Sequence, residues 1–365
     1  MTKTIVHVIG ARPNYMKIAP LMRALDGDAR IRQLLVNTGQ HYDDAMTRAF
    51  VRDLDLPIPD YDLDVGSASH AVQTARVMMK FEEVCLAERP NLVVVVGDVN
   101  STMAASLVGA KLLIPVAHVE AGLRSNDRTM PEEINRIVTD RLSDVLLTPS
   151  PDANENLRAE GVPPEKIHLV GNIMIDSLLR HLPAASLDRV RDRVPVTDGR
   201  YAVLTLHRPS NVDEPAVFSR ILTAVTTIAR QMPVVFPIHP RTRPRLSEFG
   251  FEESLRQLIV TEPLGYIDFL ALTSHARLIL TDSGGLQEES TALGIPCLTL
   301  RENTERPVTV THGTNQVVGT ETQAILDGFA AALSSTGPPP RPALWDGCTA
   351  QRIARVLRQT LGIEP

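Results

Sequence analysis

The sequence contains few cysteines, and their positions exclude two classes of protein. Cys85, Cys297 and Cys348 are its three cysteines among 365 residues. An odd number at such distant positions matches neither a disulfide framework nor a zinc site, and it fits a reducing compartment. The histidines do not cluster at metal-ligand spacing either, so we expect no bound metal.

Long apolar runs are also missing, and so is any excess of basic charge. No segment approaches the roughly 20 apolar residues that span a bilayer. The chain starts with an apolar strand pattern rather than with the basic and then apolar residues of a leader. We therefore expect a cytoplasmic protein without membrane contact, and the net charge of −6 argues against nucleic-acid binding.

Several common catalytic and nucleotide-binding signatures are absent as well. The sequence has no phosphate loop ending in Gly-Lys-Ser/Thr, no dinucleotide fingerprint of spaced glycines and no serine nucleophile elbow. These absences argue against a kinase, a nicotinamide dehydrogenase and an acyl hydrolase. We expect no cofactor.

Apolar runs alternate with helical patterns from one end of the chain to the other. Continuous apolar strands separated by helices predict parallel sheets that helices cover on both faces. The expected strands are 4–9, 33–37, 92–96, 115–119, 145–147, 167–170, 201–206, 234–238, 258–261, 278–281 and 297–300. They are too many for one sheet, so we predict two doubly wound, Rossmann-like α/β domains with a ligand cleft between them.

The boundary between these domains is expected near residue 175. Residues 1–175 would form the first domain and 176–349 the second. The stretch 181–200, rich in Arg, Asp and Pro, is expected to connect them. A last amphipathic helix at about 350–361 could cross back, so that residues 350–365 join the first domain.

The segment Asp282-Ser-Gly-Gly-Leu-Gln-Glu-Glu289 is the most informative motif of the second half. It follows the apolar run 278–280 and opens a predicted helix that ends near Leu293. The first N–H groups of a helix have no partner within it, and the helix dipole favours an anion there. Glycine lets a phosphate approach the backbone, and Glu288 or Glu289 could accept hydrogen bonds from ribose hydroxyls. The segment predicts a nucleoside diphosphate site; the alternative is an ordinary strand-to-helix turn.

Charged side chains follow the strands of the first half. Arg12 and Lys17 flank a helix start after the first strand, and both could bind a leaving diphosphate or simply face solvent. Asp98 and Glu120 directly follow two later strands, and Glu132 opens another helix. Asp98 could instead cap a helix at 101, and Glu132 could instead stabilise a helix dipole. Three acids at one edge would shift one another's pKa, which suits proton transfer.

Histidines end two successive strands of the second half. His207 begins the run His-Arg-Pro-Ser-Asn, and His239 begins the run His-Pro-Arg. The segment Arg301-Glu-Asn-Thr-Glu-Arg306 adds charge at the same edge. Each histidine could serve the structure or the chemistry, and the pattern alone leaves both open.

Taken together, these motifs resemble the non-hydrolysing UDP-N-acetylglucosamine 2-epimerases. The resemblance runs in order from residue 10 to residue 307 through Gly-x-Arg-Pro, Gly-Asp, Val-Glu-Ala-Gly-Leu-Arg, Pro-Glu-Glu-x-Asn-Arg, His-Arg-x-x-Asn, the segment 282–289 and Thr-Glu-Arg-Pro. It implies a homodimer of the two-domain glycosyltransferase-B fold. It also implies that UDP-GlcNAc and UDP-ManNAc interconvert by anti elimination of UDP to 2-acetamidoglucal and re-addition.

The resemblance assigns roles to the candidate residues. Proton transfer in the first domain would fall to Asp98, Glu120 and Glu132, with His207 as the essential histidine of the second domain. The expected substrate-binding residues, most of them in the UDP-binding second domain, are Arg12, Lys17, Arg208, His239, Ser283, Gly284, Gly285, Glu289 and Arg306.

The chain departs from the family pattern at a few positions. Asn14 stands where many members carry Glu. Gln40 and His41 match a second, activating nucleotide-sugar site, but Asp43 and Val72 replace its usual Gln and Arg. We therefore expect weak or absent activation by substrate. A glycosyltransferase of the same fold, an epimerase for a modified UDP-hexosamine and a UDP-sugar binder without catalysis remain the alternatives.

Overall fold

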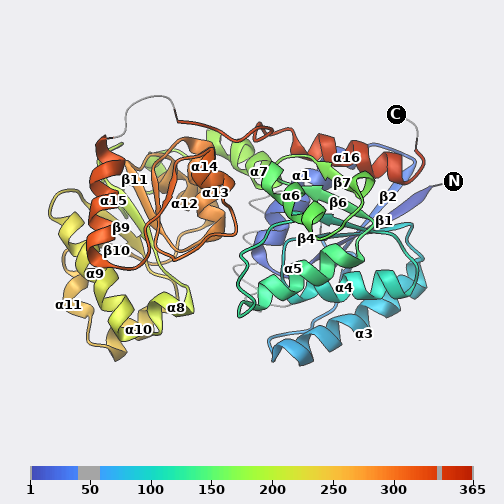
Figure 1. Cartoon of the computed structure of the whole chain (residues 1–365), viewed down its shortest axis with the longest axis horizontal. Coiled ribbons are helices and arrows are strands. Elements are labelled where there is room, and N and C mark those ends of the chain that lie inside the picture. The colour runs from blue at the N-terminus through green and yellow to red at the C-terminus, as the bar shows by residue number, and fades with distance from the viewer. Residues whose placement is uncertain (1, 40–57, 335–338, 364–365) are drawn as a thin grey trace. The chain divides into compact units, whose positions relative to one another are not determined.

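The computed structural model describes residues 2–39, 58–334 and 339–363. It divides into two compact units, one made of Met1–Ser177 with Ala343–Pro365 and the other of Leu178–Pro342 (Figure 1). Each unit contains one sheet in which every strand pair is parallel. The prediction of two parallel-sheet α/β domains is confirmed.

The first unit is built on a seven-stranded sheet in the order β3-β2-β1-β4-β5-β6-β7. Its strands are β1 Lys3–Ile9, β2 Ile31–Asn37, β3 Tyr61–Asp62, β4 Leu92–Val96, β5 Val116–Val119, β6 Val145–Thr148 and β7 Ile167–Leu169. All residues of β4 are buried, as expected for a β-branched strand covered on both faces. The strand order reverses between β1 and β4, so their carboxyl ends border the topological switch point.

Helices cover both faces of this sheet. They are α1 Arg12–Leu25, α3 His70–Glu88, α4 Asn100–Lys111, α5 Pro131–Leu142, α6 Pro151–Ala159, α7 Ile173–His181 and α16 Thr349–Thr360. Helices α3, α4 and α5 pack in sequence against one another, and α16 packs beside α1 (Figure 1).

The last helix belongs to the first unit because specific contacts hold both of its ends. Asp176 accepts hydrogen bonds from the backbone N–H groups of Thr349 (3.1 Å) and Ala350 (2.7 Å), which have no partner within α16. Near the other end, Arg358 Nε lies 3.0 Å from Asp28 Oδ2. Leu357 is fully buried between these contacts.

The second unit contains a six-stranded sheet in the order β10-β9-β8-β11-β12-β13. Its strands are β8 Ala202–Thr205, β9 Val234–Pro237, β10 Ile259–Thr261, β11 Leu278–Thr281, β12 Cys297–Thr299 and β13 Asn315–Val317. Its helices are α8 Pro209–Val212, α9 Pro215–Ala229, α10 Thr242–Glu248, α11 Glu252–Leu255, α12 Tyr266–Ser274, α13 Gly284–Leu293, α14 Val308–Thr311 and α15 Thr322–Ser334. The order again reverses at one place, between β8 and β11.

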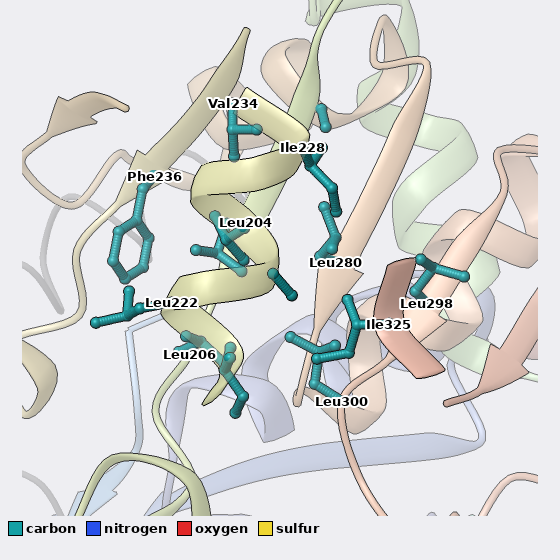
Figure 2. Close-up of a cluster of buried hydrophobic side chains, with 14 of the residues drawn as sticks. Leu204, Leu206, Leu222, Ile228, Val234, Phe236, Leu280, Leu298, Leu300 and Ile325 are labelled. Carbon is teal, nitrogen blue, oxygen red and sulfur yellow. The ribbon is translucent and has the colours of Figure 1, made fainter. Parts of the chain in front are cut away.

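One face of this second sheet is closed mainly by α9. Its buried residues recur at helical spacing and form an apolar stripe. Figure 2 shows Leu222 and Ile228 of this helix beside Leu204 of β8, Phe236 of β9 and Leu280 of β11. The packing fixes β8 and β11 as neighbours, and these are the strands whose ends carry the charged motifs.

The structure differs from the sequence-based expectation in two respects. The short edge strands β3 and β13 were not predicted, because Tyr-Asp and Asn-Gln-Val form no apolar run. The segment 181–200 is not a free connection, since it lies within the second unit and buries Leu187, Val190 and Val194 in that unit's core. Isolated apolar residues in a charged stretch gave no periodic signal for this packing.

Replacing Leu357 by Ala should lower the free energy of unfolding of the first unit by about 2–4 kcal/mol, because it opens a cavity under α16. The fluorescence of Trp345, the sole tryptophan of the chain and buried in this unit, reports its urea-induced unfolding. The exposed neighbour Gln359 provides the control, and Gln359→Ala should leave the midpoint almost unchanged. Equal midpoints for both variants would show that α16 does not stabilise the unit.

Candidate functional site

Asn14 joins the ends of β1 and β4 at the first switch point. Its Oδ1 accepts hydrogen bonds from the N–H groups of Gly10 (3.1 Å) and Ala11 (2.9 Å). Its Nδ2 donates to the carbonyl of Val96 at 3.0 Å. An amide can accept and donate in this way, whereas an ionised Glu could only accept. Arg12 opens α1 directly after this turn.

Glu120 follows β5 and is buried in an ion pair with Lys17. The site is crowded, since a Cβ on Gly97 would lie 3.4 Å from Lys17 Nζ and 3.6 Å from Glu120 Oε2. Glu120 also has a left-handed backbone with φ of +72°, which costs a residue other than glycine roughly 1–3 kcal/mol. Its Oε1 is buried without a hydrogen-bond partner in the described part of the chain. The residue is thus held in a strained position with one oxygen available.

Asp98 follows β4 and is oriented by α5. Its Oδ2 lies 3.0 Å from Arg136 Nε and 2.7 Å from Arg136 Nη2. Asn135 donates to the backbone carbonyl of Asp98 at 2.9 Å. Helix α4 begins at Asn100 with Val99 as its cap residue, so the alternative of Asp98 as the helix cap is wrong.

The neighbours Glu132 and Glu133 have different environments in the first turn of α5. Glu133 is buried and accepts from the N–H groups of Ser125 (3.0 Å) and Asn126 (2.9 Å). Burial acts to raise the pKa of Glu133, but these N–H groups and Arg136 outweigh it and lower the pKa. Glu132 is half-buried, and its side chain makes no hydrogen bond or ion pair within the described residues. Glu133 therefore holds the loop, and the carboxylate of Glu132 is available for other contacts.

Asp282 joins the ends of β8 and β11 at the second switch point. This fully buried carboxylate accepts from the N–H groups of His207 and Arg208, both at 2.9 Å. Asn211 Nδ2 lies 3.3 Å from the same carboxylate. Burial acts to raise the pKa of Asp282, but His207 and the N–H groups outweigh it and lower the pKa. The sequence contained a signal for this residue, an acid directly after an apolar strand, but it was not assigned a role.

The same carboxylate orients the imidazole of His207. His207 Nδ1 lies 2.9 Å from Asp282 Oδ1, while about 37% of the side chain remains exposed. The ring of His239 lies 5.5 Å away between centroids, and its Nδ1 accepts from Arg241 N–H at 3.1 Å. The two histidines predicted from neighbouring strand ends are therefore brought together, and His207 is positioned as in an acid–base pair.

The helix α13 presents its N-terminus as the sequence motif predicts. Ser283 is the cap residue, and its N–H donates to Thr281 Oγ1 at 2.9 Å. A Cβ on Gly284 would lie 2.7 Å from Arg306 Nη1 and 2.7 Å from Glu305 Oε1, so a larger residue would displace this ion pair. A Cβ on Gly285 would meet no atom within 4 Å, and this turn of the helix is open. The geometry suits an anion at the helix start.

Three arginines and two carboxylates form a cluster of ion pairs beside this helix. Glu305 lies 2.6 Å from Arg306, 2.8 Å from Arg301 and 3.6 Å from Arg208. Arg306 also pairs with Glu288 at 2.9 Å. Burial lowers the pKa of Arg301, the charges of Arg208 and Arg306 lower it further, and Glu305 only partly offsets them. The guanidinium groups of this cluster are of the type that binds phosphate.

Glu289 lies about one turn into α13 and has a raised pKa. Burial raises its pKa to about 7, and the charge of Glu288 acts in the same direction. The hydroxyl of Tyr266 on α12 offsets a part of this rise. The residue is a buried carboxyl whose ionisation the fold does not favour.

The remaining predicted positions fall outside this geometry. Gln40, His41 and Asp43 lie outside the described residues, while Val72 is exposed on α3. In the described ranges, no three His, Cys, Asp or Glu side chains gather as a metal site. None of the described helices is both long enough and apolar enough to cross a membrane.

Comparisons with known proteins show one family. A family model for UDP-N-acetylglucosamine 2-epimerase matches residues 23–358. The chain is 42% identical to the UDP-N-acetylglucosamine 2-epimerase of Methanocaldococcus jannaschii, over 96% of this chain and 97% of the relative. It is 38% identical to the UDP-2,3-diacetamido-2,3-dideoxy-D-glucuronate 2-epimerase of Pseudomonas aeruginosa, over 97% of this chain and 99% of the relative.

A solved structure is similar over the same length. The crystal structure of the Methanocaldococcus jannaschii UDP-GlcNAc 2-epimerase in complex with UDP-GlcNAc and UDP has a TM-score of 0.90 and 41% sequence identity. The match covers 98% of this chain and 99% of that chain.

The pKa of Glu289 predicts a pH-dependent stability difference. A folded pKa of about 7 against an ordinary value of 4.5 means that the folded state holds its proton more tightly. The contribution of Glu289 to stability is therefore full below pH 4.5 and is lost as the pH rises to 7. Glu289→Gln removes this loss and should stabilise the protein at pH 8 by about 1–3 kcal/mol.

Calorimetric melting between pH 5 and pH 8 tests this expectation. The melting temperatures of wild type and Glu289→Gln should diverge as the pH rises. Glu252→Gln, at an exposed position, should follow the wild type throughout. Parallel curves for wild type and Glu289→Gln would mean that Glu289 titrates normally.

Proposed function

The chain belongs to the UDP-N-acetylglucosamine 2-epimerase family, and we propose that it interconverts UDP-GlcNAc and UDP-ManNAc. As a member of this family it is an isomerase, similar over nearly its whole length to epimerases of that name. The observation that carries the proposal is the division of chemical groups between the units. The first gathers carboxylates at a strand-end switch point, and the second combines an oriented histidine with an anion-binding helix start.

The chemistry of the sugar explains why such groups are needed. The C2 proton of the hexosamine is not acidic, because no carbonyl is attached to that carbon. Elimination of UDP across C1 and C2 avoids a free carbanion and gives 2-acetamidoglucal. UDP then adds back after C2 has been protonated from the opposite face. The reaction needs proton-transfer groups at C2 and a site that stabilises the departing diphosphate.

We assign the proton transfers at C2 to Asp98, Glu120 and Glu132 as a set. Glu120 has a buried oxygen without a hydrogen-bond partner in the described chain, and Glu132 has a carboxylate without a hydrogen bond or ion pair there. Lys17 pairs with Glu120, and Arg136 pairs with Asp98. These ion pairs fix the orientation of both carboxylates. Carboxylates held in this way present their oxygens at a fixed position, where they can accept or return a proton.

We assign the diphosphate to the start of α13 and to the adjacent arginines. The N–H groups of Gly284 and Gly285 and the guanidinium of Arg306 would stabilise the charge that develops on UDP. His207, oriented by Asp282, would donate to the same phosphate. Glu289 would accept from the ribose hydroxyls, and Arg12, Ser283, Arg208 and His239 complete the proposed binding set.

A modified sugar is the second candidate substrate. The 38% identity to an epimerase of a diacetamido uronate favours it specifically. Both reactions share the elimination at C2 and differ in the groups at C3 and C6 of the sugar. A glycosyltransferase would need fewer acids at the first switch point, so the geometry favours epimerisation.

As part of the same proposal, we place the enzyme in the cytoplasm. Cys85 and Cys297 are free and buried, and burial raises the pKa of each thiol to about 12. Such thiols are unreactive and fit a reducing compartment.

Incubation with UDP-GlcNAc in heavy water tests the reaction. Proton NMR should show loss of the C2 proton signal and the appearance of UDP-ManNAc without any acceptor. Asp98→Asn and Glu120→Gln should each slow the exchange by about 100-fold or more, because they remove a proton-transfer group. Glu165→Gln, at an exposed position, is the matched control and should exchange like the wild type.

The possible results separate the candidate functions. Exchange that occurs only with a diacetamido uronate would replace the substrate but keep the mechanism. Consumption of UDP-GlcNAc only in the presence of an acceptor would indicate a transferase. Binding without exchange would indicate a regulator.

We further propose that the enzyme is a homodimer joined through α3. Val72, Met79 and Leu86 follow one another at seven-residue spacing and are 43%, 69% and 59% exposed. At 100° per residue they lie almost opposite the buried residues Val77 and Phe81. An apolar groove of about 540 Å³ runs beside them between α3, α4 and α5. An apolar stripe on a helix that already packs on its other face suits a second copy of the chain.

The double variant Met79→Lys/Leu86→Lys should convert the dimer to a monomer, because it places charges in the proposed interface. Sedimentation velocity gives the mass of both proteins. Gln359→Lys adds a charge on the exposed face of α16 and should leave the dimer intact. A monomeric wild type, or a dimeric double variant, would contradict the proposed interface.

A further inference from the structure

Two loops carry Asp98 and Glu120, and one buried imidazole contacts both. His118 lies on β5, two residues before Glu120, and is fully buried. Its Nε2 lies 2.8 Å from the carbonyl oxygen of Gly97, the residue before Asp98. Its Nδ1 lies 2.6 Å from Asp140 Oδ1 on α5. The imidazole therefore links the end of β4, the end of β5 and helix α5.

Asp140 also holds the chain on the other side of Glu120. Its Oδ2 accepts from the N–H group of Gly122 at 3.0 Å. The same oxygen lies 2.7 Å from Arg124 Nη1. The Asp140 carboxylate thus contacts His118, Gly122 and Arg124, which lie on both sides of Glu120 in the sequence.

Both hydrogen-bond partners of His118 are acceptors. The Gly97 carbonyl can only accept, so Nε2 carries a hydrogen. Burial acts to raise the pKa of Asp140, but His118 and Arg124 outweigh it and lower the pKa, so Asp140 is a carboxylate that also only accepts. His118 therefore lies between two groups that accept, and Glu160 pairs with the far side of Arg124 at 2.7 Å.

The backbone around Glu120 needs this support. Glu120 has φ of +72° and Gly122 has φ of +82°, so the loop is strained at a residue other than glycine. Such conformations persist only where surrounding contacts determine them. A Cβ on Gly122 would lie 2.4 Å from the carbonyl oxygen of Ala153, so the loop cannot shift freely toward α6.

Helix α5 carries the complementary groups on one face. Glu133, Arg136 and Asp140 follow at three- and four-residue spacing, which aligns them along the helix. Glu133 holds the loop at Ser125, Arg136 holds the Asp98 carboxylate and Asp140 holds the Glu120 loop. Glu132 stands at the start of the same helix.

We propose that Asp140 and His118 are positioning residues that fix the spacing between the acids Asp98 and Glu120. They touch neither the sugar nor the nucleotide and act through the backbone of the two loops. The proposal rests on the proposed epimerase function, since it gives the two acids their shared role at C2. A loop displacement of about 1 Å can cost roughly 100-fold in rate when reacting groups must be aligned.

Asp140→Asn is the first test, because the amide keeps the shape but removes the charge that pairs with Arg124 and one of the oxygens that accept. We expect kcat to fall by about 10- to 100-fold, while the affinity for UDP, measured by calorimetry, stays at the wild-type value. UDP binding depends in our proposal mainly on the second unit, so retained affinity also shows a folded protein. A parallel loss of UDP affinity and kcat would indicate a general structural defect and overturn the proposal.

Two variants at His118 separate its contacts. The amide nitrogen of Asn can occupy the place of Nδ1, and that of Gln the place of Nε2. His118→Asn should therefore keep the contact to Asp140 and lose that to Gly97, whereas His118→Gln should do the reverse. We expect both to lower kcat with UDP affinity retained, since each breaks the link between the loops. Wild-type kcat in both would overturn the proposal.

A double-mutant cycle tests whether Asp140 acts through Glu120. The measured quantity is the rate of deuterium exchange at C2. Asp140→Asn should lower this rate by a far larger factor in the wild-type protein than in the Glu120→Gln variant. An equal decrease in both proteins would mean that Asp140 does not act through Glu120. Arg141→Gln, at the exposed next position of α5, is the control and should exchange normally. If wild type itself does not exchange C2, the proposed function fails rather than the positioning role.

Discussion

In each sheet one buried polar side chain joins the backbone at two strand ends that diverge, and the rest of the site is built around that contact. At a topological switch point the following helices leave on opposite faces, so backbone groups at the strand ends need partners from side chains. Asn14 supplies them in the first unit and Asp282 in the second. Asn14 faces both N–H groups and a carbonyl, which requires an amide. Asp282 faces only donors, which suits a carboxylate and leaves it able to orient His207.

The charged side chains around the two switch points differ. In the first unit the carboxylate of Asp140 lies between His118 and Arg124, and Glu160 pairs with the far side of Arg124. The acids proposed for catalysis stand beside this network. In the second unit Glu305 lies close to Arg208, Arg301 and Arg306, and Arg306 also pairs with Glu288. Burial and the neighbouring arginines lower the pKa of Arg301. Guanidinium groups gathered in this way can bind a diphosphate. The proposed division of proton transfer and leaving-group stabilisation between the units fits these different surroundings.

The sequence predicted the strands that carry the site more closely than the contacts that hold it. The runs 92–96 and 278–281 were bounded correctly because a fully buried parallel strand is apolar without interruption. The ion pair of Asp98 was not predicted. In the sequence, an acid directly after a strand can equally be a helix cap or an ion-paired residue, and only the position of Arg136 in the structure decides between them. His118 and Asp140 were missed as well. A histidine inside the buried run Val-Ala-His-Val was a usable signal, because a polar group buried on both faces needs a partner.

The buried acids of the chain differ in whether the protein's own contacts stabilise them. Glu133, Asp140 and Asp282 are buried, yet N–H groups and cations lower the pKa of each, so ionisation stabilises the folded state. Glu120 and Glu289 are held less favourably, each for a different reason. Glu120 has a strained backbone and a buried oxygen without a partner in the described chain, and the pKa of Glu289 is raised to about 7. A fold selected for stability alone would replace both. Their presence near the two switch points is explained if a bound ligand supplies the hydrogen bonds that the protein does not make to these carboxyl groups.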